Sequence, residues 1–170
     1  MKFLRVTRLD DSDEHVYAPA ARVGELAVTG SFVFTFADDD PESMTGKPRQ
    51  AFRTGFLGLE SFGWATLVRI VDISEDEYEQ AVEALARHLM RAYGAPSLAE
   101  ALPVARREVD FAAGLCEHGV GTLLALERHA DGEGIHEAFR RVLPQRADWE
   151  GHGGEVRIWE MFPDTRSVRK

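Results

Sequence analysis

The chain has 170 residues, of which 44% are hydrophobic and 29% charged, and its 29 acidic and 20 basic side chains give a formal net charge of -9 at pH 7. Affinity for polyphosphate grows with clustered Lys and Arg, so an acidic chain without a basic stripe is not expected to bind nucleic acid. No apolar run approaches the roughly 20 residues that cross a bilayer, which excludes a membrane-spanning protein. We predict a single domain over residues 1–165 and a short basic tail over 166–170.

Two strands are predicted in the first half of the chain. Alternation at period two predicts a strand over 25–36 with one buried face. The buried row consists of Leu26, Val28, Phe32, Phe34 and Phe36. A loop is expected from Ala37 to about Gln50. A second strand over 64–73 is largely apolar on both faces, which favours a place in the middle of a sheet.

Capping signals predict two consecutive helices in the middle of the chain. Ser74 and Glu77 form a capping box before apolar residues at helical spacing, and Gly94 ends that helix. Ser97 begins the second helix, which runs to near Gly119. Pro103 is tolerable in it only within the first turn, because proline lacks an N–H donor.

The remaining segments return to strands. A strand is predicted over 121–129 and a turn over 130–134, where Asp and Gly accept turn geometry. Residues 135–143 fit a short helix slightly better than a hairpin strand, and both interpretations stay open. A strand over 156–162 closes the chain.

This order predicts an α+β fold with two layers. Strands come first, two helices follow and strands resume, which is unlike a repeating βαβ unit. The sheet is expected to be mostly antiparallel. The two helices are expected to pack on one face of it, covering the phenylalanine row.

The segment 52–64 is the main candidate for a binding site. Three glycines and four aromatic residues surround one arginine, one glutamate and one serine. Glycine allows close backbone approach and aromatic rings give rigid walls, a combination that small-molecule pockets use. The alternative is a core-packed loop that leads into the central strand. The candidate ligand-binding residues are Arg53, Phe56, Glu60, Ser61, Trp64, Cys116 and His118.

Cys116 and His118 are the second candidate, at the end of the second helix. A thiol and an imidazole two residues apart can share a metal ion, or the imidazole can lower the pKa of the thiol. The negative potential of a helix C-terminus disfavours a thiolate, so a core thiol and a capping histidine are the competing interpretation.

No metal or cofactor is predicted. The six histidines contain no H-x-x-x-H pair, and the carboxylates of 38–40 lack the spacing of a calcium loop. Phosphate-binding and dinucleotide-binding glycine motifs are incomplete. A single cysteine and an N-terminus without the apolar run of a signal peptide favour a cytoplasmic location.

Several segments resemble an uncharacterised family of small proteobacterial proteins, a domain of unknown function. The run 51–68 is similar to the hallmark segment of that family, and 3–10, 115–118 and 121–123 are similar to it as well. The resemblance implies a bacterial cytoplasmic origin, and it brings no activity, ligand or catalytic residue.

Three hypotheses for function follow. The leading one is a non-catalytic accessory or binding protein that recognises a small molecule or a protein partner through 52–64. The second is an enzyme with Glu60 as acid or base and Cys116 or Ser61 as nucleophile, assisted by His118 and Arg53, which requires these side chains to converge in one cleft. The third is a homodimer joined through an edge strand, the first or the last.

Overall fold

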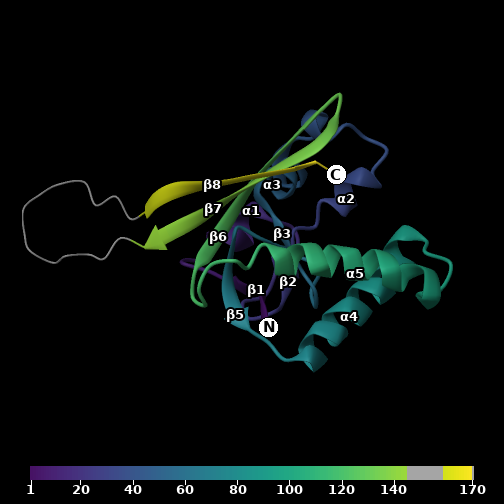
Figure 1. Ribbon diagram of the computed structural model, residues 1–170. Helices are drawn as coiled ribbons and strands as arrows, with labels where there is room; N and C mark the ends of the chain where they lie inside the picture. The colour runs from purple at the N-terminus through teal and green to yellow at the C-terminus, as the bar shows by residue number, and fades with distance from the viewer. Residues whose placement is uncertain (145–158, 170) are drawn as a thin grey trace, which may run out of the picture.

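The computed structural model of the protein describes residues 1–144 and the backbone of 159–169 (Figure 1). The strands are β1 (Lys2–Thr7), β2 (Ala27–Val28), β3 (Phe56–Gly58), β4 (Trp64–Ala65), β5 (Leu67–Asp72), β6 (Leu123–Asp131), β7 (Gly134–Pro144) and β8 (Trp159–Arg169). The helices are α1 (Ser12–Val16), α2 (Phe32–Thr35), the 3-10 helix η1 (Pro41–Ser43), α3 (Gly46–Thr54), α4 (Glu75–Tyr93) and α5 (Leu98–Gly114). The predicted α+β class is confirmed.

The strands form two antiparallel sheets. The larger has the order β1-β5-β6-β7-β8, and the smaller has the order β2-β3-β4. β5 lies inside the larger sheet, as its two apolar faces predicted, although residues 64–65 of that predicted strand belong to the smaller sheet. A bridge between Arg5 and Leu26 joins the sheets and covers part of the free edge of β1.

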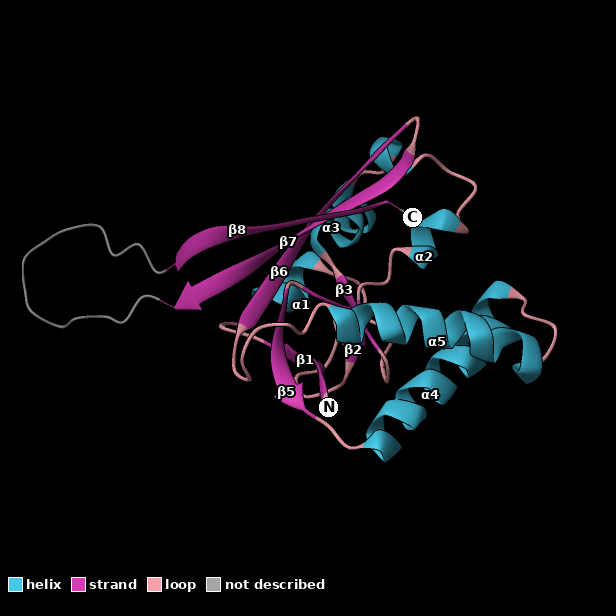
Figure 2. Ribbon diagram, viewed as in Figure 1, coloured by secondary structure: helices cyan, strands magenta, loops and turns pink. Residues whose placement is uncertain are grey.

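The two long helices lie together on one side of the strands (Figure 2). The predicted capping box of α4 is present, with Ser74 accepting from the backbone of Glu77, and Ser97 caps α5 in the same way through the Glu100 N–H. Helices and both sheets share one core cluster of buried side chains. Among the described residues, no helix combines the length and the apolar composition that a membrane crossing needs.

The expectation that the second helix tolerates Pro103 only within its first turn is wrong. Pro103 lies inside α5, whose first residue is Leu98. Because Pro103 has no N–H, the carbonyl of Ala99 lacks its helical hydrogen bond, and both residues are exposed. Water can therefore satisfy the free carbonyl, and the helix continues through the proline.

The predicted strand over 25–36 is wrong beyond Val28. The chain turns at Gly30, whose φ of 80° is in the left-handed region, and Phe32–Thr35 then forms α2. Phe32 and Phe34 are buried, but Phe36 is 54% exposed. The three rings therefore do not line a strand under the helices, although Phe32 does meet Tyr93 at the end of α4.

The segment 37–50, expected as a loop, contains η1 and the first half of α3. Residues 135–143 are strand rather than helix, since β7 pairs with β6 from Gly134 to Val142 across a tight turn. The predicted closing strand is β8, which runs on to Arg169 through most of the expected tail. Residues 156–158 of that prediction lie outside the described residues.

Candidate functional site

The segment 52–64 is largely built into the core. Phe56 is fully buried and Trp64 nearly so, while Arg53 is exposed on α3. All three glycines serve close packing within the fold, because a Cβ would clash with the Trp64 ring at Gly55, with the carboxylate of Glu25 at Gly58 and with the backbone of Ala20 at Gly63. Phe56 and Trp64 are therefore core residues and line no ligand cavity with Glu60.

A buried carboxylate holds the turn between β3 and β4. Glu25, 2% exposed, accepts hydrogen bonds from the backbone N–H of Arg22 (2.6 Å), Glu60 (2.6 Å) and Ser61 (2.8 Å). The hydroxyl of Ser61 also donates to Glu25 and accepts from the N–H of Gly63. Ser61 is thus a structural residue of this turn. The hydrogen bonds to Glu25 hold the backbone of Glu60, and the Glu60 side chain stays exposed.

A cavity of about 260 Å³ lies beside Glu60, and we refer to it as the Glu60 cavity. It opens where β1, the start of β2, the β3–β4 turn and the first half of α4 meet. Its polar lining consists of Arg5, Glu60, Glu77 and Gln80, and its apolar lining of Leu26, Leu59, Ala81 and Ala84.

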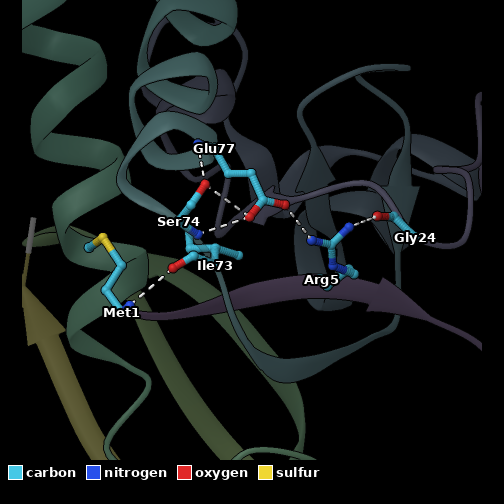
Figure 3. A network of polar contacts seen from close by, with 6 residues as sticks. All are labelled: Met1, Arg5, Gly24, Ile73, Ser74 and Glu77. Carbon is cyan, nitrogen blue, oxygen red and sulfur yellow. Dashed lines mark hydrogen bonds and ion pairs between the residues drawn. The ribbon is translucent and has the colours of Figure 1, made fainter.

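The polar wall on the β1 side is a preorganised network (Figure 3). Arg5 donates to the carbonyl of Gly24 at 2.7 Å and to Glu77 at 3.1 Å. The other oxygen of Glu77 accepts from the backbone of Ser74 at 2.9 Å, which closes the capping box. That backbone hydrogen bond, together with Arg5, holds the pKa of Glu77 below its ordinary value. The charges of Arg5 and Glu77 therefore compensate each other within the cavity wall.

Glu60 is held much more loosely than Glu77. Its carboxylate lies 3.5 Å from Arg22, and both side chains are about two-thirds exposed, at 66% and 67%. Exposed ion pairs contribute about 0–1 kcal/mol, because water screens them and both side chains lose rotamer freedom. A cationic group that enters the cavity can therefore take the place of Arg22 at little cost.

Cys116 lies in different surroundings from Glu60. The thiol is buried and donates to the carbonyl of Ala112 at 3.5 Å. Desolvation raises the pKa of Cys116 to about 12, an effect that Lys2 only partly opposes. Near neutral pH the group is therefore a neutral thiol, which is a poor nucleophile. Lys2 also donates to the carbonyl of His118 at 2.7 Å, so β1 supplies a cation at this end of α5.

The convergence required by the enzyme hypothesis is not found. The lining of the Glu60 cavity includes neither Cys116 nor His118, and Ser61 is committed to Glu25. The structure brings Glu60 together with Arg5 and Gln80, which sequence reasoning did not select. Within the described residues, a group of potential metal ligands is found elsewhere, on the β6–β7 hairpin.

The comparison with protein families identifies the chain at family level. A model described as a family of unknown function, DUF6505, matches residues 1–154. The chain belongs to this family. The range contains the run 51–68, on which the expected membership of a family of unknown function was based, and that expectation is confirmed at this level. No curated protein and no solved structure matches the chain.

Proposed function

We propose that the protein is a non-catalytic binding protein of the bacterial cytoplasm, and that the Glu60 cavity holds a cationic group of a small ligand or of a partner protein. The observation that carries this proposal is the composition of the cavity. An apolar floor lies next to two carboxylates: Glu77 is held by Arg5 and by the backbone of Ser74, whereas the exposed ion pair of Glu60 with Arg22 is weak and replaceable.

Charge supports a cationic occupant. Arg5 and Glu77 neutralise each other in the wall, whereas the only ion-pair partner found for Glu60 among the described residues is Arg22, which is exposed and does not line the cavity. The whole chain carries a formal charge of -9, which attracts cations over longer distances.

Size supports a small occupant. The cavity of about 260 Å³ is below the roughly 300–1,000 Å³ of pockets that enclose drug-sized ligands. One lysine or arginine side chain, or a small amine with a short apolar part, matches this volume better than a nucleotide cofactor does. The lone, buried thiol of Cys116 suits the reducing cytoplasm, which is part of the same proposal.

The two other hypotheses have less support. The enzyme hypothesis lacks a thiolate at Cys116 and a free hydroxyl at Ser61. A homodimer through an edge strand stays a prediction. β1 and β8 are the edges of the larger sheet, and the edge of β1 is partly covered by Leu26. Light scattering on the purified chain tests it.

The binding proposal is tested by titration monitored by NMR. Amide-capped, N-acetylated lysine and arginine serve as cationic probes, and N-acetylglutamate serves as an anionic control. We expect the cationic probes to shift the amide signals of Glu60, Ser61 and Gln80, and Glu60→Gln to weaken binding about fivefold, the equivalent of about 1 kcal/mol.

Glu83→Gln is the matched control. Like Glu60, Glu83 is an exposed glutamate in an ion pair. It lies on α4, 2.6 Å from Arg87, and it does not line the cavity. Its substitution should leave probe affinity unchanged. Equal affinities of the native chain and Glu60→Gln, or shifts that spread over the whole acidic surface, would refute the proposal.

A further inference from the structure

The β6–β7 hairpin places three potential metal ligands together on its outer face. His129 and His136 are cross-strand partners, and Asp131 lies two residues after His129 on the same side of β6. The two rings stack with centroids 4.8 Å apart. One ligand atom from each of the three residues falls within 4.8 Å of the others, and His136 Nε2 lies 2.9 Å from Asp131 Oδ1.

We propose that His129, Asp131 and His136 bind a zinc ion. Two imidazole nitrogens and one carboxylate oxygen are a donor set that Zn²⁺ accepts in proteins, with water in the fourth tetrahedral position. Bonds of about 2.0–2.1 Å place the ligand atoms of such a site about 3.3 Å apart. The Asp131–His136 distance is already shorter than this, so the remaining adjustment falls on side-chain rotation at His129, which is exposed.

The sequence alone conceals this site. His136 follows His129 by seven positions in the sequence, a spacing that matches no metal motif of a helix or a loop. In an antiparallel hairpin, however, the two positions become direct neighbours because the turn at 132–133 lies midway between them. The site was missed because 135–143 was favoured as a helix, in which His136 would not face His129.

Acidic side chains near Asp131 favour a cation. Asp131 also lines a hollow of about 320 Å³ that contains Asp39 and Asp40 from the segment before η1. The hairpin tip and this segment meet at the end of the molecule remote from α4 and α5 (Figure 1). Farther along the same face, the positive charge of Arg140 is compensated by Glu127 at 2.7 Å. Asp39 and Asp40 therefore contribute negative potential beside the proposed site.

A purely structural role explains less of this arrangement. The carboxylate of Asp131 accepts from the Glu133 N–H at 2.8 Å, which accounts for an Asp at the turn. That role needs neither histidine. The stacked imidazoles of the exposed His129 and the partly buried His136, next to the same carboxylate, are the feature that a metal ion accounts for. This site is independent of the Glu60 cavity and of the function proposed for it.

The test is zinc titration of the full chain, purified without a polyhistidine tag and freed of metal by a chelator. A chromophoric chelator competes for Zn²⁺ and reports stoichiometry and affinity. We expect one zinc ion per chain. His129→Gln and His136→Gln should each lower the affinity by about tenfold or more, because removal of a group that merely supports a metal ligand already costs about 10–100-fold.

His15→Gln is the matched control, because His15 is an exposed histidine on α1 outside the cluster. Zinc should raise the thermal midpoint of the native chain and of His15→Gln, and not that of His129→Gln, since only a ligand bound to the folded state stabilises it. In the presence of chelator all variants should melt together, which establishes that they fold. Unchanged zinc affinity in either cluster variant, or an equal loss in His15→Gln, would overturn the proposal.

Discussion

The two faces of the β6–β7 hairpin carry adjacent cross-strand pairs with opposite roles. Arg128 faces Glu137 on the inner side, and their side chains are 0% and 2% exposed. The next pair along, His129 and His136, faces outward. Successive side chains of a strand point to opposite faces of the sheet, so neighbouring residues lie alternately in the core and toward water. One pair is therefore part of the core, and the other lies on the outer face, where we propose the zinc site.

The inner pair connects the hairpin to the rest of the molecule. Besides its ion pair with Glu137 at 3.0 Å, Arg128 donates to the carbonyls of Phe52 and Thr29, both at 2.6 Å, and of Gly55 at 3.2 Å. Burial lowers the pKa of Arg128, and the Glu137 carboxylate opposes that shift. One guanidinium thus satisfies carbonyls at the end of α3 and around the smaller sheet, which a point charge such as lysine could not do.

Removing the inner cation should have the largest effect of any substitution considered for this hairpin. Arg128→Met leaves Glu137 buried without its partner and several carbonyls without donors, so we expect a loss of about 3–5 kcal/mol in the free energy of unfolding. Urea denaturation followed by circular dichroism measures it. The control Arg87→Met, which removes an exposed i,i+4 pair with Glu83, should cost about 0.3–0.5 kcal/mol.

The double variant Arg128→Met with Glu137→Leu sharpens the comparison. If the ion pair alone matters, removing both charges should restore most of the stability. We expect only partial recovery, because the carbonyls of Phe52, Thr29 and Gly55 still lack a donor. Full recovery would mean that Arg128 is held for its charge rather than for its hydrogen bonds.

Glu77 on α4 is intermediate in burial between the inner and the outer pair of the hairpin. It is partly exposed, but it accepts hydrogen bonds from the backbone of Ser74 and from Arg5. Its pKa in the folded chain lies below the ordinary value of 4.5, so its contribution is complete above that pH and is lost as pH falls through the folded pKa. We expect the stability of the native chain to fall in this acidic range, with a shallower fall in Glu77→Gln. Urea midpoints measured from pH 6 to pH 3 compare the two, and parallel curves would contradict the expectation.

The smallest effect is expected for the outer ion pair of the hairpin. Glu127 and Arg140 are 52% and 34% exposed, and their separation is 2.7 Å. Glu127→Gln should change the free energy of unfolding by about 0–0.5 kcal/mol, because water replaces the interaction. The same urea experiment applies. A loss above about 1 kcal/mol would show that the outer face is less solvated than its exposure indicates.

Local signals explain which elements could be predicted. Ser74 and Ser97 each accept a hydrogen bond from an N–H three residues later in the chain, so both helix starts could be predicted from the sequence. β5 was recognisable from its two apolar faces. Phe32, Phe34 and Phe36 fit the alternation of a strand, but the chain turns at Gly30, which has a φ of 80° and lies so close to Leu57 and Trp64 that a Cβ would clash with both.

The residues of the candidate site likewise divide into those that the sequence indicated and those that only the fold brings together. Glu60 could be selected from its unusual neighbours, and Glu77 was visible as part of a capping box. Glu25 could not be recognised as the clamp of the Glu60 turn, because its partners lie about 35 residues away in the chain. Arg5 and Gln80 likewise acquire their place in the cavity only when β1 and α4 pack together.

By itself the sequence determined the charge, the fold class and the starts of the two long helices, since these depend on composition and on interactions within a few residues; the end of the second helix, expected near Gly119, lies at Gly114. Only the tertiary structure decided which polar groups are buried. Arg128 bonds carbonyls more than 70 residues away, and His129 faces His136 only after the hairpin forms. Desolvation and pairing depend on the neighbours that folding supplies, so two adjacent polar pairs of one hairpin differ in burial: Arg128 and Glu137 lie in the core, and His129 and His136 lie on the outer face.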